Sequence, residues 1–127
     1  MPRDLKKEVC HVVLSIPDKV QGMSITDDDK VVFSTSYGRR NDSRLHIYEN
    51  YTQWNTDTVT VFDTDVQLYI AKRKNRILRF RMPTLMEGLD YHDGNLYVIF
   101  ESGAQTYADA KEINKDIWEI NINGIIG

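Results

Sequence analysis

The 127-residue sequence has a single cysteine, Cys10, and no apolar stretch near the length of a membrane helix. One cysteine excludes an intrachain disulfide and a zinc centre built from several thiolates. A spanning helix needs about 20 mostly apolar residues, so none is expected. Cys10 alternates with Val12 and Leu14 in an apolar run, and we favour a small buried hydrophobic residue over a reactive thiol.

The chain also lacks a strong excess of either charge. It has 16 Lys and Arg against 19 Asp and Glu, which gives a net charge of -3. This balance gives no reason to expect nucleic acid or an anionic membrane as a partner. The first residues, MPRDLKKEVC, contain no apolar leader. A cytoplasmic location is therefore expected, and secretion stays open if the chain is a fragment.

What the sequence does contain is an internal similarity. Residues 17–36, PDKVQGMSITDDDKVVFSTS, align without a gap with residues 83–102, PTLMEGLDYHDGNLYVIFES. The identical pairs are Pro17/Pro83, Gly22/Gly88, Asp27/Asp93, Val32/Val98 and Ser36/Ser102. Apolar positions match as well, so the sequence predicts a duplicated structural unit.

Each copy is predicted to hold four short strands, because its runs are rich in β-branched and aromatic residues with partial alternation. The expected strands are 9–16, 20–26, 30–36 and 44–49, then 76–82, 86–91, 95–101 and 116–122, with a hairpin near 57–62 and 66–71 between them. Gly22 and Gly88 inside strands predict a bulge or a closely packed neighbouring backbone. Residues 107–116 are expected to form a short helix or an extended loop.

Four antiparallel strands in about 40–45 residues is the size of one β-propeller blade. The stretches VQGMSITDDDKVVFSTSYG and MEGLDYHDGNLYVIFESGA resemble blades of bacterial β-propeller proteins of the lactonase-like and NHL-like superfamily. They also resemble the C-terminal blades of uncharacterised members. The resemblance covers about half of the chain. It implies blade architecture and no particular activity.

We therefore predict an all-β fold of antiparallel four-stranded propeller-like blades, as a partial propeller of two to three blades. The single domain, 1–127, would comprise a first unit at 9–49, an irregular hairpin at 50–75 and a second unit at 76–122. A closed propeller has four to eight blades. Open blade faces and strand edges favour a homo-oligomer or the remainder of a larger propeller. A small sandwich or open barrel is the third arrangement.

Two carboxylates are not explained by the repeat. In gluconolactonase-like propellers, an EG glutamate at the start of an innermost strand ligates a divalent metal, and the resemblance implies Ca²⁺ or Mg²⁺ at Glu87. Its counterpart in the first copy is the amide Gln21, which favours hydrogen bonding between blades instead. Glu101 and Ser102 end the next strand, where a turn role is favoured over ligand binding.

The loop STSYGRRNDSR, residues 34–44, is the other polar concentration. Its ligand-binding candidates are Ser36, Tyr37, Arg39 and Arg40. Arginine with tyrosine can hold carboxylates, phosphates or sugars, and ordinary turn formation explains the loop equally well. In the basic run AKRKNRILRFR, alternating Arg79 and Arg81 predict an exposed strand face. Residues 72–75 predict a solvated hairpin turn, and we favour these roles over nucleic-acid binding.

The expected function is a non-catalytic β-propeller-type binding or assembly protein that completes its fold by self-association. A small molecule or sugar is the expected ligand. The alternative is a metal-dependent lactonase-like or other hydrolase with a carboxylate-lined central site. His11, His46 and His92 are dispersed, and their spacing supports no Ser-His-Asp arrangement.

Overall fold

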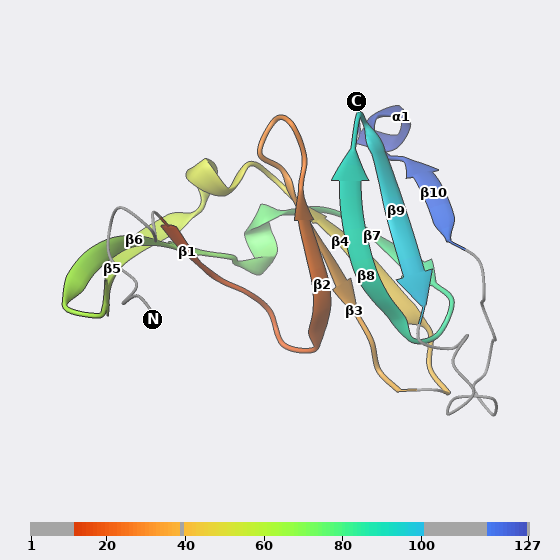
Figure 1. The fold of residues 1–127 in the computed structure, drawn as a ribbon, viewed down its shortest axis with the longest axis horizontal. Helices are drawn as coiled ribbons and strands as arrows, with labels where there is room; N and C mark the ends of the chain where they lie inside the picture. Colours follow the sequence, from red (N-terminus) through yellow and green to blue (C-terminus); the bar gives the residue numbers. More distant parts are fainter. Residues whose placement is uncertain (1–11, 39, 101–116, 127) are drawn as a thin grey trace, which may run out of the picture.

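The computed structural model describes residues 12–38, 40–100 and 117–126, and its strands form three small sheets (Figure 1). In chain order the elements are β1 (Val12–Ser15), β2 (Val20–Ile25), β3 (Val31–Thr35), β4 (Ser43–Tyr48), η1 (Tyr51–Gln53), β5 (Asn55–Val61), β6 (Thr64–Ile70), η2 (Arg73–Asn75), β7 (Arg76–Met82), β8 (Met86–His92), β9 (Asn95–Phe100), β10 (Trp118–Asn121) and α1 (Ile122–Ile126). The all-β prediction is confirmed. The segment 107–116 lies outside the described residues, within which no helix is long and apolar enough to cross a membrane.

The first sheet has the strand order β2-β3-β4-β7 and is antiparallel throughout. All five residues of its inner strand β3, VVFST, are buried. A strand covered on both faces reads as a continuous run of this kind. The edge strand β7 instead alternates between covered and exposed residues, as the sequence predicted. The first sheet is therefore fully covered at β3 and open along one face of β7.

Two strands belong to sheets other than those expected. We expected β1 and β7 to begin the two four-stranded units, but β7 completes the first sheet beside β4, with Phe80 opposite Leu45. β1 runs parallel to β6, with Val13 opposite Leu68. The expectation that every pair is antiparallel was wrong at this point. Pairing depends on contacts distant in sequence, which periodicity does not report.

The second sheet, β10-β9-β8, packs face to face with the first (Figure 1). Buried apolar side chains from both sheets fill the space between them, and α1 contributes one more. They are Val32, Leu45, Ile47, Met82, Met86, Leu96, Val98 and Ile122. Burying one such side chain contributes about 1.5–3 kcal/mol. This core therefore holds the two sheets together.

Gly22 and Gly88 lie at irregularities of the pairing register, so the predicted bulges are confirmed. The register shifts between Val20 and Gly22 in the β2–β3 hairpin and between Met86 and Leu89 in the β8–β9 hairpin. A bulge bends its strand and increases the local twist. Both hairpins therefore bend near the start of their first strand.

The turns of these hairpins differ in length by one residue. Ile25 pairs with Val31, six positions later, whereas Tyr91 pairs with Leu96, five positions later. The gapless alignment of the two copies is therefore wrong beyond the turn, where the offset changes from 66 to 65 residues. One residue reverses the faces of a strand, so the correction decides which side chains are counterparts.

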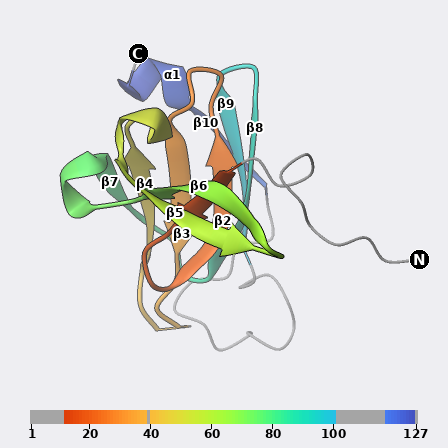
Figure 2. The ribbon, with the colours of Figure 1, turned by 90° about the vertical axis from the view of Figure 1, so that its left-hand side faces the viewer.

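The third sheet, β1-β6-β5, is called the arm. It packs against the other face of the first sheet, and Figure 2 shows β5 and β6 running across the strands behind them. Leu14 of β1 and Tyr69 of β6 pack against a buried cluster that includes Phe33, Tyr48 and Trp54. The ring centroids of Phe33 and Tyr48 lie 5.2 Å apart. The hairpin predicted between the two units is confirmed as β5 and β6.

The segment from Lys72 to Asn75 is not the hairpin turn that we expected, because it connects the arm to the first sheet. Asn75 is buried, and its side-chain amide donates to Glu49 Oε1 at 2.8 Å. Its carbonyl oxygen accepts from the backbone N–H of Lys72 at 3.0 Å. These bonds fix the point at which the chain crosses from one sheet to the other.

Candidate functional site

The loop between β3 and β4 forms one wall of a polar pocket of about 440 Å³. Tyr37 and Arg40, both predicted as ligand-binding residues, line it. Arg79 reaches the same pocket from β7, because β7 pairs with β4. The lining, called the arginine pocket below, consists of Tyr37, Arg40, Asn41, Asp42, Arg44 and Arg79.

Two other loop candidates do not form part of this lining. Ser36 is half-buried just after β3, and Arg39 lies outside the described residues. Sequence reasoning missed Arg44 and Arg79 as members of the site. The alternation in β7 placed Arg79 on an exposed strand face, which is correct. The alternation could not show that β7 pairs with β4, and this pairing brings Arg79 to the pocket beside Arg44.

The shape of the loop is fixed by its own backbone and one amide side chain. Gly38 has a φ of 90°, a left-handed value that glycine adopts without strain. Asn41 Nδ2 donates to the carbonyl of Tyr37 at 2.8 Å. Asparagine often closes turns in this way. Gly38 and the Asn41 side chain therefore support the turn at Tyr37 on the pocket's edge.

The charges of the arginine pocket are unequal. Its one carboxylate, Asp42, forms an ion pair with Arg81 Nε at 3.3 Å, outside the lining. Arg44 Nη1 donates to the backbone carbonyl of Ser43 at 3.1 Å. In the described part of the chain, the other two guanidinium groups of the lining have no carboxylate partner. The pocket therefore has an excess of positive charge.

A buried histidine lies beside these arginines. His46 is directly opposite Arg79 in the register, and its Nε2 lies 2.9 Å from Thr35 Oγ1. Its Nδ1 is buried without a hydrogen-bond partner among the described residues. Burial lowers the pKa of His46 to about 4, and the charges of three neighbouring arginines act in the same direction. The imidazole is therefore neutral near pH 7.

The predicted metal ligand Glu87 is half-buried in β8, and its counterpart Gln21 is exposed in β2. The backbone oxygen of Glu87 accepts a hydrogen bond from Ser34 Oγ at 2.8 Å. Across the described residues, no group of three or more His, Cys, Asp or Glu could hold a metal. The metal therefore stays a prediction. Glu101 and Ser102 lie outside the described residues.

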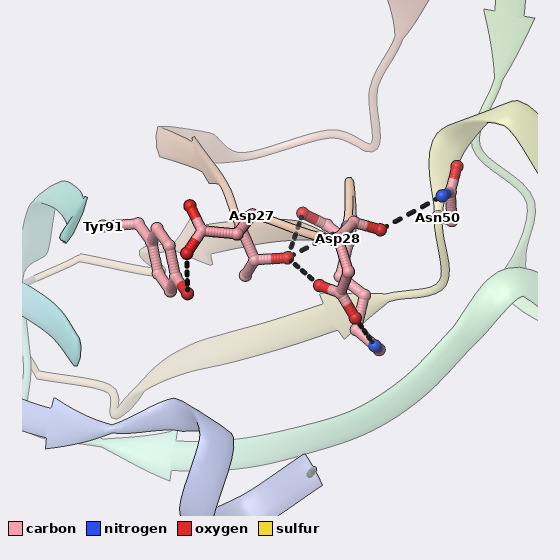
Figure 3. Close-up of polar contacts among 6 residues, drawn as sticks. Asp27, Asp28, Asn50 and Tyr91 are labelled. Atoms are coloured by element: carbon pink, nitrogen blue, oxygen red, sulfur yellow. Dashed lines mark hydrogen bonds and ion pairs between the residues drawn. The ribbon is translucent and has the colours of Figure 1, made fainter. Parts of the chain in front are cut away.

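The acidic turn between β2 and β3 has structural partners (Figure 3). Asp27 Oδ2 accepts from the hydroxyl of Tyr91, in the second sheet, at 3.2 Å. Lys30 forms an ion pair with Asp28, and this contact lowers the pKa of the Asp28 carboxyl. Asn50 Nδ2 donates to the carbonyl of Asp28 at 3.1 Å. The turn therefore ties three parts of the fold together.

A second surface lies on the outer face of the second sheet. It is an apolar groove of about 260 Å³, lined by Gly88, Leu89, Asp90, Tyr97, Ile99 and Ile117. Ile99 is 48% exposed and Ile117 is 66% exposed. Apolar side chains gathered on one exposed face are typical of contact surfaces.

Comparisons with protein-family models, with curated proteins and with solved structures gave no match to this chain. Its function is therefore argued from its own two surfaces, the arginine pocket and the apolar groove.

Proposed function

We propose that the chain is a non-catalytic binding or assembly protein that extends a propeller-like stack of sheets by association with further copies of itself. The observation that carries this proposal is the apolar groove. In this groove, Gly88 and the facing side chain of Ile99 are arranged as Gly22 and Ser34 are on the first sheet, where β8 packs.

The contact between the two sheets provides the template. β8 lies against β2 so closely that a Cβ added at Gly22 would lie 2.2 Å from the Glu87 carbonyl oxygen. Ser34, on the adjacent strand, donates its hydroxyl proton to that same oxygen. Gly22 at its bulge and Ser34 on the adjacent strand thus form the contact surface, or seat, on which β8 packs.

The apolar groove has the same two parts. A Cβ at Gly22 would lie 2.9 Å from Ser34 Oγ, and a Cβ at Gly88 would lie 2.7 Å from the Ile99 side chain. With the one-residue correction at the turn, Ile99 is the counterpart of Ser34. The seat on the second sheet is therefore apolar, which favours an apolar partner strand.

The strand that fits this seat is β2 of a second copy. β2 and β8 are both edge strands, and β2 carries Met23 and Ile25 where β8 carries Leu89 and Tyr91. Leu89 and Tyr91 pack into the core between the sheets. Met23 and Ile25 are 42% and 38% exposed. Burial of such apolar surface contributes about 25 cal/mol per Å² and so favours association.

An interface between β2 of one copy and the groove of the next joins two different surfaces. Such head-to-tail contacts close into a ring when the rotation permits and otherwise form open filaments. A ring would supply the blades that one chain lacks, because closed propellers have four to eight.

The test is sedimentation velocity of the full chain at micromolar concentration. The unaltered chain is expected to associate, and the Met23→Glu and Ile99→Asp variants are each expected to sediment as monomers. Each variant retains the surface that the other lacks. An equimolar mixture is therefore expected to form a heterodimer and no larger species.

Phe62→Asp is the matched control, because Phe62 is an exposed apolar residue in the arm. This variant is expected to associate like the unaltered chain, and circular dichroism checks that all variants are folded. A monomeric unaltered chain would contradict self-association. Failure of the mixture to form heterodimers would contradict the head-to-tail arrangement.

A further inference from the structure

The arginine pocket concentrates positive charge on a rigid support. Arg44 and Arg79 come from adjacent strands, β4 and β7, and Arg40 comes from the loop that Gly38 and Asn41 shape. The paired strands fix the backbone positions from which Arg44 and Arg79 extend. These arginine side chains still lose rotamer freedom when they bind a ligand.

Among the described residues, the positive charge in this pocket is not balanced by carboxylates. Asp42 already forms its ion pair with Arg81, and the described carboxylates form no ion pair with Arg40, Arg44 or Arg79. Guanidinium groups that line one pocket repel one another, and a bound anion reduces that repulsion. The pocket would therefore attract a negative group from outside the chain.

His46 is a buried polar group on the same pair of strands. It lies opposite Arg79, is only 8% exposed, and has a buried Nδ1 without a hydrogen-bond partner in the described part of the chain. A buried polar atom without a partner is uncommon in a folded protein. The neighbouring arginines also disfavour protonation of this ring. The neutral ring therefore lies beside the pocket and neither adds to its positive charge nor offsets it.

We propose that the arginine pocket binds a small oxyanion-bearing molecule, through a carboxylate or a phosphate group. Arginine suits both groups, because its planar guanidinium donates two parallel hydrogen bonds to two oxygens. The Tyr37 side chain and the Asn41 amide, also in the lining, would contact the uncharged part of the ligand. The pocket's volume of about 440 Å³ falls within the range of small-molecule sites.

The experiment is an NMR titration of the full chain with three probes: inorganic phosphate, glucuronate and uncharged glucose. Phosphate, glucuronate or both are expected to shift the amide signals of residues 37–44 and 79, and glucose alone is not. The phosphate arm and the glucuronate arm identify which oxyanion the pocket prefers. No shift with either anion at about 10 mM, where a 1 mM Kd would give near saturation, overturns the proposal.

Arg79→Gln is the informative variant, and Arg73→Gln, an exposed arginine in η2, is its matched control. Arg79→Gln is expected to weaken anion binding by about tenfold or more, the usual effect of a charged hydrogen bond. Arg73→Gln is expected to bind as the unaltered chain does. Equal weakening in both variants would indicate unspecific charge attraction and overturn the assigned site. The result is independent of self-association, which Arg79→Gln leaves intact.

Discussion

At the scale of single residues, His46 shows how composition and position combine. The sequence shows His46 only as one of three dispersed histidines, and the structure places it buried in β4. Its position opposite Arg79 places the ring near positive charge, which disfavours its protonation. The desolvated ring, surrounded by cations, is held neutral, so folding and protonation compete at this residue.

This competition predicts a pH dependence of stability. The pKa of His46 falls from 6.5 in the unfolded chain to about 4 in the folded one. Between these values the unfolded chain binds more protons, so the free energy of unfolding decreases as the pH falls from about 6.5 to about 4. The full effect is up to about 3 kcal/mol. Urea unfolding at several pH values measures it.

His46→Gln is expected to flatten this pH dependence, because the titrating group is gone. His92→Gln is the control. It also removes one histidine, but His92 is exposed at the β8–β9 turn. The same slope in the unaltered chain and in His46→Gln would show that the histidine is not responsible.

The sequence predicted part of the candidate site and could not predict the rest. Tyr37 and Arg40 were identified because a tyrosine and arginines stand together in one loop. Arg79 lies 39 positions beyond Arg40, and only the pairing of β7 with β4 brings it near. Local composition contains no record of such pairing. The neutral His46 was missed for the same reason.

At the scale of elements, the two bulged hairpins have similar form and different surroundings. Gly22 faces a backbone oxygen of another strand, whereas Gly88 faces Cγ1 and Cδ1 of the Ile99 side chain. A backbone atom cannot move aside without shifting its whole strand. A side chain can change rotamer at small cost.

The difference predicts unequal effects of the same substitution. Gly22→Ala is expected to destabilise the fold by about 1–3 kcal/mol, the usual cost of overpacking a tight contact. Gly88→Ala is expected to cost less than half as much, because the exposed Ile99 side chain can turn away. Thermal and urea unfolding measure both. Similar losses in the two variants would contradict the described contacts.

The strands themselves were predicted closely, whereas their partners were not. β7 was expected at 76–82 and spans Arg76–Met82, because alternating arginine and apolar residues mark it clearly. The prediction that β7 begins the second unit was wrong. β7 pairs with β4, which precedes the inserted arm in the sequence. Alternation reports which face of a strand is buried. It does not report what buries that face.

At the scale of the whole molecule, the described chain consists of a packed pair of sheets and an arm attached to one face. The paired sheets share a core of fully buried side chains. In the arm, five of the seven residues of β5 are exposed, and β5 is an edge strand. Regions with few buried apolar contacts open more readily than the core.

Hydrogen exchange is therefore expected to separate the two parts. Backbone amides paired between β5 and β6 should exchange about 100-fold faster than those paired between β3 and β4. Exchange measured by mass spectrometry or NMR resolves these segments. Equal protection in both pairs would mean that the arm and the sheets open as one cooperative unit.

The return of β7 to the first sheet also affects how the chain emerges from a ribosome. Met82 pairs with Ser43, so the first sheet cannot be completed until the whole arm has been synthesised. Until then the outer edge of β4 offers unpaired N–H and C=O groups to any other extended chain. Contacts this distant in sequence also slow folding. The nascent protein is thus most exposed to aberrant strand pairing while residues 49–75 are being made, well before its last strands appear.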